Sequence, residues 1–170
     1  MKFSEMTYTR PDPAASKQRL SALTAELKAA KSYEEARKVF LSQQELMSHI
    51  STAATLASIR HSIDTRDKFY DGEEKFWNNF NPELEEYNQA WTAAMLESPF
   101  RADFEKEYGD LMFVNAEIAL KTFSPAIIPE LQQENDLTQE YEKLLASAQI
   151  PFEGKVYTLS LIHISEPTRR

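Results

Sequence analysis

Metal-binding side chains are few in this sequence and are poorly spaced for a shared ion. Apart from one in the last ten residues, the histidines are His49 and His61, which lie twelve positions apart. On one helix that separation is about 18 Å at 1.5 Å per residue, whereas two helical histidines on one zinc ion need i, i+4 spacing. The sequence contains neither a His-Glu-x-x-His motif nor a cysteine. We therefore predict no catalytic, cofactor-binding or metal-binding residue in this chain, and structural or solvent-facing roles for both histidines.

Three glutamates in the last third of the chain are the other candidate metal ligands. Glu130 and Glu134 are spaced i, i+4 and share one face of a predicted helix, and Glu140 follows them. Because no histidine accompanies them, we expect a solvated acidic face rather than a metal site.

Aromatic side chains offer a second kind of candidate surface. We expect core roles for them, although a peptide-binding channel would also use some such residues. No Ser-His-Asp arrangement, glycine-rich phosphate loop or basic-aromatic stripe is recognisable beside them. The aromatic residues concerned are Phe76, Trp77, Phe80, Trp91 and Phe100.

The segment Arg60–Thr65 reads as the end of one helix and the start of the next. Arg60 and His61 stand where cations favour a helix C-terminus, and Asp64 or Thr65 can cap the following helix, with Asp67 in its first turn. That structural account is sufficient, and a contact to a peptide substrate or to a catalytic domain is the alternative.

The elements that would position these residues are predicted to be about six helices in an antiparallel array, with one small β-hairpin near residues 150–159. Helical periodicity, capping residues and the prolines set their bounds. The predicted helices are Pro13–Lys31, Tyr33–Asp64, Thr65–Asn78, Asn81-Pro82 to about Glu97, Ser98-Pro99 to Tyr108, Asp110–Thr122, and Ser124-Pro125 to about Ala148.

The predicted core follows from the same periodicity. An extended lead-in, Met1–Asp12, should pack Tyr8 and Pro11 on the helices. The inward residues should be Leu20, Leu23 and Leu27 of the first helix, then Ala36, Val39, Phe40, Met47, Ile50, Ala54 and Ala57, and later Phe113, Val114 and Ile118.

Composition excludes several functions. The formal net charge is −8, which argues against nucleic acid or an anionic membrane as a partner, since both need a basic face. No apolar run reaches the length of a membrane span, and the polar N-terminus offers no signal-peptide core. We expect a cytoplasmic protein.

Two stretches of the chain resemble a known enzyme family. The segment Arg60–Glu73, and the later Glu134–Leu137 with Glu140–Leu144, are similar to the N-terminal helical region of oligoendopeptidase F-type enzymes, zinc oligopeptidases of the thimet oligopeptidase family. The resemblance extends over roughly residues 3 to 160. It implies a largely helical metalloendopeptidase, a hydrolase that cleaves oligopeptides in an enclosed channel. It also implies zinc held by two histidines of a His-Glu-x-x-His helix and a later glutamate.

The expected organisation follows from this resemblance. Residues 1–160 should be the N-terminal helical domain of a metallopeptidase, inactive alone because the zinc-binding motif is missing, with zinc and oligopeptide substrates belonging to the full-length parent. Residues 161–170 resemble a translated sequencing-adaptor read and are expected to be an artefactual tail. The alternative is a stand-alone helical module that binds a peptide or a protein partner.

Overall fold

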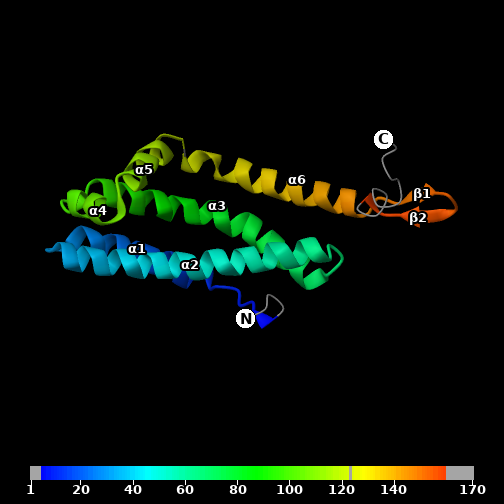
Figure 1. Ribbon diagram of the computed structural model, residues 1–170, viewed down its shortest axis with the longest axis horizontal. Coiled ribbons are helices and arrows are strands. Elements are labelled where there is room, and N and C mark those ends of the chain that lie inside the picture. The colour runs from blue at the N-terminus through cyan, green and yellow to red at the C-terminus, as the bar shows by residue number, and fades with distance from the viewer. Residues whose placement is uncertain (1–4, 123, 160–170) are drawn as a thin grey trace.

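The chain folds into an elongated array of helices with one small hairpin, as predicted (Figure 1). The structure is a computed structural model, and it describes residues 5–122 and 124–159. Its elements are α1 (Pro13–Ala29), α2 (Tyr33–Ile63), α3 (Lys68–Leu96), α4 (Arg101–Tyr108), α5 (Leu111–Thr122), the 3-10 turn η2 (Pro125–Ile127), α6 (Ile128–Ala146), β1 (Ile150–Phe152) and β2 (Lys155–Tyr157).

Two apolar clusters hold the first three helices together. The stripe predicted for α1 is confirmed, because Leu20 packs in one cluster and Leu23 and Leu27 in the other. The predicted inward face of α2 is confirmed as well: Ala36, Phe40, Ile50 and Ala57 are buried, and Val39, Met47 and Ala54 are partly buried against them. Each fully buried large apolar side chain contributes about 1.5–3 kcal/mol, so these clusters dominate the stability of the bundle.

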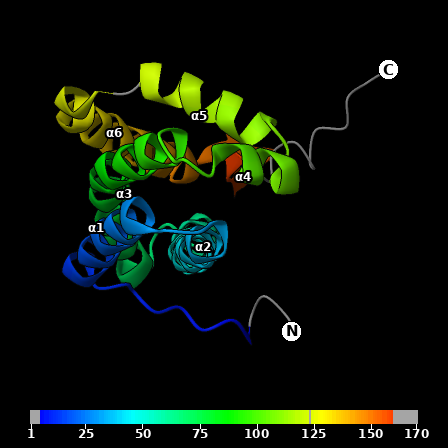
Figure 2. The same cartoon turned by 90° about the vertical axis from the view of Figure 1, so that its left-hand side faces the viewer.

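Helix α3 lies at the centre of the array, between α1 and α6 (Figure 2). Its buried aromatic side chains, Trp77, Phe80 and Trp91, supply both clusters, which places them in the core as expected. Phe76 and Phe100 are partly buried at the edges of the same clusters. The long central helix therefore connects the bundle of α1 and α2 on one side to α6 on the other.

The first two helices begin at the capping residues that the sequence predicts. Asp12 accepts a hydrogen bond from the Ala15 amide at 2.7 Å, and Ser32 Oγ accepts one from the Glu35 amide at 3.2 Å. The Glu35 carboxylate accepts its own bond from the Lys31 amide at 2.8 Å, one residue earlier than in a standard capping box. The cap is therefore reciprocal and fixes the start of α2.

The prediction of a helix boundary at Asn81-Pro82 is wrong, because α3 runs without interruption from Lys68 to Leu96. Pro82 has no N–H to bond the carbonyl of Asn78, which normally ends or kinks a helix. Here that carbonyl accepts a hydrogen bond from Asn135 Nδ2 of α6 at 3.1 Å. A contact from a distant helix thus supplies the bond that the proline cannot make.

The apolar residues of α5 are only partly used in the core. Phe113 is buried as predicted, but Val114 and Ile118 are 46% and 54% exposed, so their predicted inward orientation is wrong. Helix α5 packs on α3 and α4 along one narrow side, and the adjacent positions of its helical wheel face away from that contact.

The predicted hairpin is confirmed as a two-residue turn. Strands β1 and β2 pair antiparallel, with Phe152 opposite Lys155, and the turn residues Glu153 and Gly154 have φ values of 47° and 75°. Two consecutive residues with positive φ are typical of the type I′ turn that matches strand twist. The predicted tail, Leu161–Arg170, lies outside the described residues.

Candidate functional site: a polar junction of α2, α3 and α6

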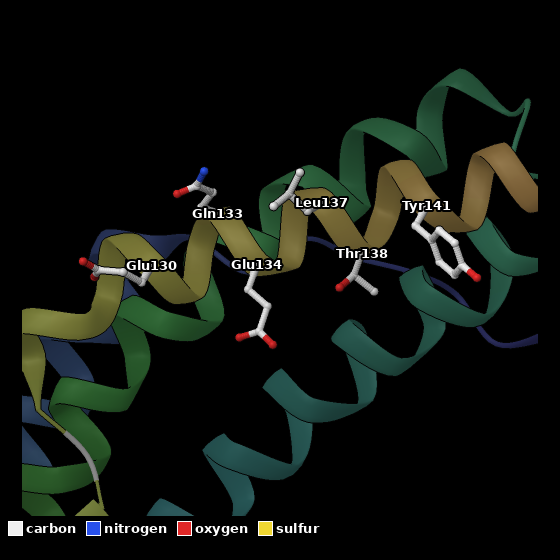
Figure 3. Close-up of a pocket in the computed structure, with 6 residues that line it drawn as sticks. All are labelled: Glu130, Gln133, Glu134, Leu137, Thr138 and Tyr141. Carbon is white, nitrogen blue, oxygen red and sulfur yellow. The ribbon is translucent and has the colours of Figure 1, made fainter.

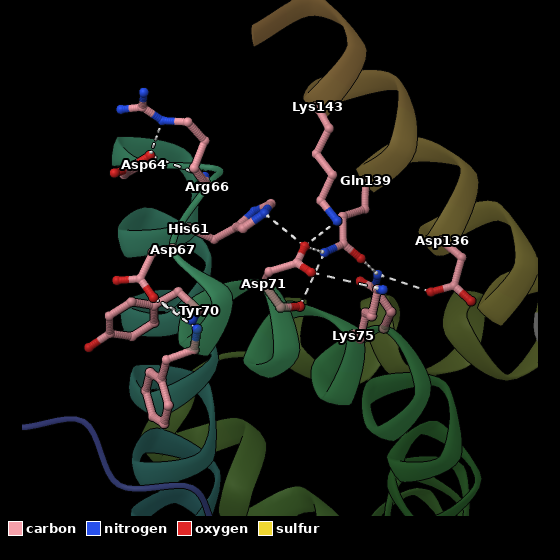
Figure 4. A network of polar contacts seen from close by, with 12 residues as sticks. His61, Asp64, Arg66, Asp67, Tyr70, Asp71, Lys75, Asp136, Gln139 and Lys143 are labelled. Carbon is pink, nitrogen blue, oxygen red and sulfur yellow. Dashed lines mark hydrogen bonds and ion pairs between the residues drawn. The ribbon is translucent and has the colours of Figure 1, made fainter. Parts of the chain in front are cut away.

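The ends of three helices meet around the carboxylate of Asp71 (Figure 4). Lys143 of α6 pairs with Asp71 Oδ1, and Gln139 Nε2 donates to the same oxygen at 3.0 Å. Lys75 Nζ lies 3.9 Å from the other oxygen. The hydrogen bond from Lys143 is the main cause that lowers the pKa of Asp71, so the carboxylate is held ionised at the joint between α3 and α6.

A chain of amide side chains continues the junction along α3. Asn78 Nδ2 donates to Gln139 Oε1 at 3.0 Å and to Asp136 Oδ1 at 3.3 Å. Gln132 Nε2 donates to the carbonyl of Asn79 at 3.0 Å. The face of α6 that contacts α3 is therefore polar, and Gln139 is the one residue of α6 that the structure shows as buried.

His61 lies at the edge of this junction and is 1% exposed. Its Nε2 is 3.6 Å from Asp71 Oδ1, which is too long for a hydrogen bond. Neither ring nitrogen has a hydrogen-bond partner among the described residues, and the same holds for Glu74 Oε2. Burial raises the pKa of Glu74 above its ordinary value of 4.5, which favours its neutral form.

The helix caps near Arg60 differ from the prediction. Asp67, expected in the first turn, is the N-cap of α3 and accepts from the Phe69 and Tyr70 amides at 2.9 and 3.3 Å. Asp64 is instead the C-cap of α2. The cap moves because the linker between the helices extends to Asp67, beyond Asp64 and Thr65. Arg60 donates to Tyr70 Oη at 2.7 Å and to the Met6 carbonyl, so it fastens the lead-in to the helix ends.

Two of the three candidate carboxylates, Glu130 and Glu134, project from α6 beside Gln133, Leu137, Thr138 and Tyr141 (Figure 3). Glu130 and Glu134 line a shallow pocket of about 530 Å³ together with Leu137 and Tyr141. Glu140 is exposed and does not line it. His49 is exposed on α2. Within the described residues, no group of three histidine, aspartate or glutamate side chains is arranged to hold a metal ion.

A second pocket, of about 350 Å³, opens between α2, α3 and α5. Its walls are mostly apolar, and the buried amide of Gln43 is among them. No charged residue is among the described residues that line it. This pocket, named here the Gln43 pocket, differs in chemistry from the acidic pocket on α6.

The residues at the centre of the junction were not singled out from the sequence. Asp71, Gln139 and Lys143 are polar residues of types that usually face solvent, so the sequence gives no local reason to expect them at a helix junction. The sequence marks only the segments around two of them, because Asp71 lies in Arg60–Glu73 and Lys143 in Glu140–Leu144, which carry the family resemblance. The structure brings these two stretches, which carry the family resemblance, into direct contact.

No single helix in the described part of the chain is long and apolar enough to cross a membrane. Helix α5 and the segment Pro125–Ala146 pass the length and composition test only as a pair, bent by 62°.

Comparison with known proteins identifies a family and close structural relatives. The sequence model of the Peptidase M3 N-terminal domain matches residues 3–123. An X-ray structure of a provisionally assigned oligoendopeptidase F superposes with a TM-score of 0.93 at 39% identity, over 96% of this chain and 29% of its own. A solved structure of PZ peptidase A with an inhibitor superposes with a TM-score of 0.92 at 38% identity, over 96% of this chain and 29% of its own.

A provisionally assigned oligoendopeptidase F from Bacillus anthracis str. Ames gives a TM-score of 0.91 at 38% identity, over 96% of this chain and 30% of its own. The chain thus spans 29% to 30% of the length of the solved structures that it matches. No curated protein matches it.

Proposed function

Because this chain belongs to the M3 peptidase family through that family's N-terminal domain, we propose that it is the non-catalytic helical region of a zinc-dependent oligoendopeptidase. The observation that carries the proposal is the match over residues 3–123 together with a TM-score of 0.93 at 39% identity to an oligoendopeptidase F structure. In the whole protein, the substrates would be oligopeptides, enclosed in a channel to which this region contributes a wall.

The described histidines are not arranged to share a zinc ion. His61 is buried beside Asp71, His49 is exposed twelve residues earlier on α2, and no third ligand accompanies either among the described residues. In the proposal, the zinc that activates the attacking water belongs to another part of the whole protein. The contribution of this chain is to bind and orient peptide, with the Asp71 junction fixing α6 against α3.

The experiment has two parts. The purified 170-residue chain should take up no stoichiometric zinc and should not cleave a quenched fluorescent oligopeptide. A chimera that carries this chain in place of the matching 30% of the Bacillus anthracis relative should cleave the peptide and lose that activity with a chelator. The unaltered relative is the control.

Chelator-sensitive cleavage by the 170-residue chain alone would refute the non-catalytic role. A chimera that folds with native helicity, binds zinc and yet cleaves no peptide would refute its place in an oligoendopeptidase. The cytoplasmic location stays a prediction.

A second candidate function is a stand-alone interaction module. The observation that favours it is a row of exposed apolar residues on α6, which leaves surface for a partner. The melting behaviour of the chain, discussed below, separates the two.

A further inference from the structure

We propose that the Gln43 pocket is a peptide-binding subsite, which takes one bulky uncharged side chain and holds the adjacent peptide bond on the Gln43 amide. The inference deepens the proposed function and rests on it for the identity of the ligand as a peptide. The pocket lies between α2, α3 and α5, and none of the residues that line it belongs to the Asp71 junction.

The interior of the pocket is apolar and adaptable. Phe40, Trp91 and Phe113, all buried in one apolar cluster, form its walls with Met47 and Met112. Methionine is flexible and polarisable, so such walls can adjust to aromatic and branched side chains. A volume of about 350 Å³ is at the small end for ligand sites, which suits one side chain and its backbone rather than a folded segment.

Gln43 supplies a hydrogen-bond donor to a mostly apolar pocket, whose other polar lining residues are Gln44, Asn88, Thr92 and Asn115. Its side chain is 5% exposed, and its Oε1 accepts from Gln44 Nε2 at 2.8 Å. That bond leaves Gln43 Nε2, with two N–H groups, without a partner among the described residues. Gln43 Nε2 is not among the buried polar atoms that lack a partner, so it stays accessible to water, and a peptide carbonyl in the pocket can replace that water as the acceptor.

Asn88 of α3 completes the complementarity. Its Nδ2 makes one long bond to Glu85 at 3.4 Å, and its Oδ1 accepts none from the described residues. The pocket therefore offers an amide donor and an amide acceptor, which match the C=O and the N–H of a peptide bond.

Charge decides which side chain fits. The chain has a net charge of −8, yet none of the described residues that line this pocket is charged. A lysine, arginine, aspartate or glutamate side chain would lose its hydration here without gaining a counter-charge. The pocket should therefore prefer phenylalanine or leucine.

The test uses the full 170-residue chain and capped tripeptides, acetyl-Gly-X-Gly-amide, with X as Phe, Leu, Ala, Lys or Glu. Binding is followed by the fluorescence of Trp91, which lines the pocket, and by chemical-shift changes in NMR spectra. The Phe and Leu peptides should bind at least about tenfold more tightly than the other three. Gln43→Leu, which removes the donor, should weaken binding of the Phe peptide about fivefold.

Ala116→Trp fills the pocket from α5 and should abolish binding. Glu134→Gln, in the acidic pocket on α6, is the matched control and should leave binding unchanged. Circular dichroism checks the fold of each variant. If Ala116→Trp does not fold, Ala119→Leu at the same wall replaces it.

Absence of Phe-peptide binding, equal binding of the Lys peptide, or unaltered binding in a folded pocket-filling variant would each overturn the proposal. These outcomes are independent of the chimera. An inactive chimera together with Phe-selective binding in the Gln43 pocket would refute the proposed peptidase function and support the subsite. An active chimera without binding of the Phe peptide would support the peptidase function and refute the subsite.

Discussion

At the scale of single residues, Glu73 fastens the N-terminal lead-in to the bundle. Its carboxylate is 4% exposed and accepts from Arg10 Nε at 2.9 Å, from Arg10 Nη2 at 2.6 Å, and from Tyr8 Oη. The hydrogen bonds from Arg10 lower the pKa of Glu73. Burial, followed by the Glu73 carboxylate, raises the pKa of Tyr8 to about 12. Trp77 Nε1 also donates to Tyr8 Oη at 3.2 Å, so the predicted packing of Tyr8 on the helices is confirmed.

Replacing Arg10 with alanine should lower the free energy of unfolding at pH 7 by about 1.5 kcal/mol, the low end for hydrogen bonds to a charged group, because the guanidinium is about half exposed. The pKa of Glu73 is depressed in the folded chain, so this stabilisation is present above the ordinary value of 4.5 and is lost as pH falls through the folded value. Urea titrations at pH 7 and at lower pH measure it.

The matched control is Arg19→Ala, which removes an ion pair with Glu26 in which both side chains are nearly half exposed. Arg19→Ala should lower the free energy of unfolding by less than about 0.5 kcal/mol. If both variants lose the same amount, or if the Arg10→Ala penalty grows toward acid pH, the buried Glu73 carboxylate does not anchor the lead-in.

At the scale of helices, Pro82 and Asn135 form one unit although 53 residues separate them. Asn135→Ala should lower the free energy of unfolding by about 1 kcal/mol, because the Asn78 carbonyl loses the hydrogen bond from Asn135 Nδ2. In a Pro82→Ala background the new N–H can bond that carbonyl, so the same change should cost clearly less. A double-mutant cycle by urea unfolding should give a coupling of about 1 kcal/mol.

Gln132→Ala is the control for this cycle. Gln132 donates to the carbonyl of Asn79, whose helical partner, the N–H of Glu83, is intact. Its effect should therefore be the same in both backgrounds. Additive effects of Asn135→Ala and Pro82→Ala would show that the bond from α6 does not compensate for the proline.

Local signals predicted most of the helical fold. The Leu20, Leu23 and Leu27 stripe, the cap at Ser32 and the Glu153-Gly154 turn act over a few residues, so sequence alone identifies them. The unbroken α3 could not be predicted, since the partner that satisfies Asn78 lies on another helix.

The candidate site was less accessible to sequence reasoning than the helices. Asp71 and Lys143 are ordinary surface residue types, and only the packing of α6 on α3 brings them together. The donors of the Gln43 pocket were missed for the same reason, since a glutamine on α2 carries no local sign that it is buried. Family resemblance marked the right segments around Asp71 without indicating which side chains meet.

At the scale of the whole molecule, α6 is oriented against the usual rule for amphipathic helices. Its side toward α3 is polar, whereas Leu137, Tyr141 and Leu144 on its outer side are 57%, 60% and 67% exposed. These three residues are named here the α6 stripe. Neighbouring exposed apolar residues add up to surface that monomeric proteins normally cover.

We predict that the 170-residue chain binds a dye specific for apolar surface, associates in a concentration-dependent way and melts in a shallow transition. Each Å² of apolar surface left in water costs about 25 cal/mol, so an uncovered patch of a few hundred Å² forfeits several kcal/mol. Leu137→Glu with Leu144→Glu should reduce dye binding and association without lowering the melting temperature. Fluorescence and sedimentation measure these changes.

Leu23→Ala, in the centre of a cluster, is the contrasting variant and should cost about 2–5 kcal/mol of stability. A sharply cooperative melt of a strictly monomeric wild-type sample would instead show that the chain is stable without a further segment or partner packed on the α6 stripe. That result would favour the stand-alone interaction module.

The polar interface between α3 and α6 also implies an order of events in time. Helices α1, α2 and α3 share apolar clusters, whereas α6 contacts α3 largely through side-chain hydrogen bonds, so we expect α6 to open at a lower free energy than the bundle. The backbone amides of α6 should therefore exchange with deuterium well before those in the middle of α1, and Gln139→Leu should leave exchange in α1 unchanged. Equal exchange rates in the two helices would mean that the array opens as one unit; unequal rates would make α6 a segment that the molecule can release and take back while the rest stays folded.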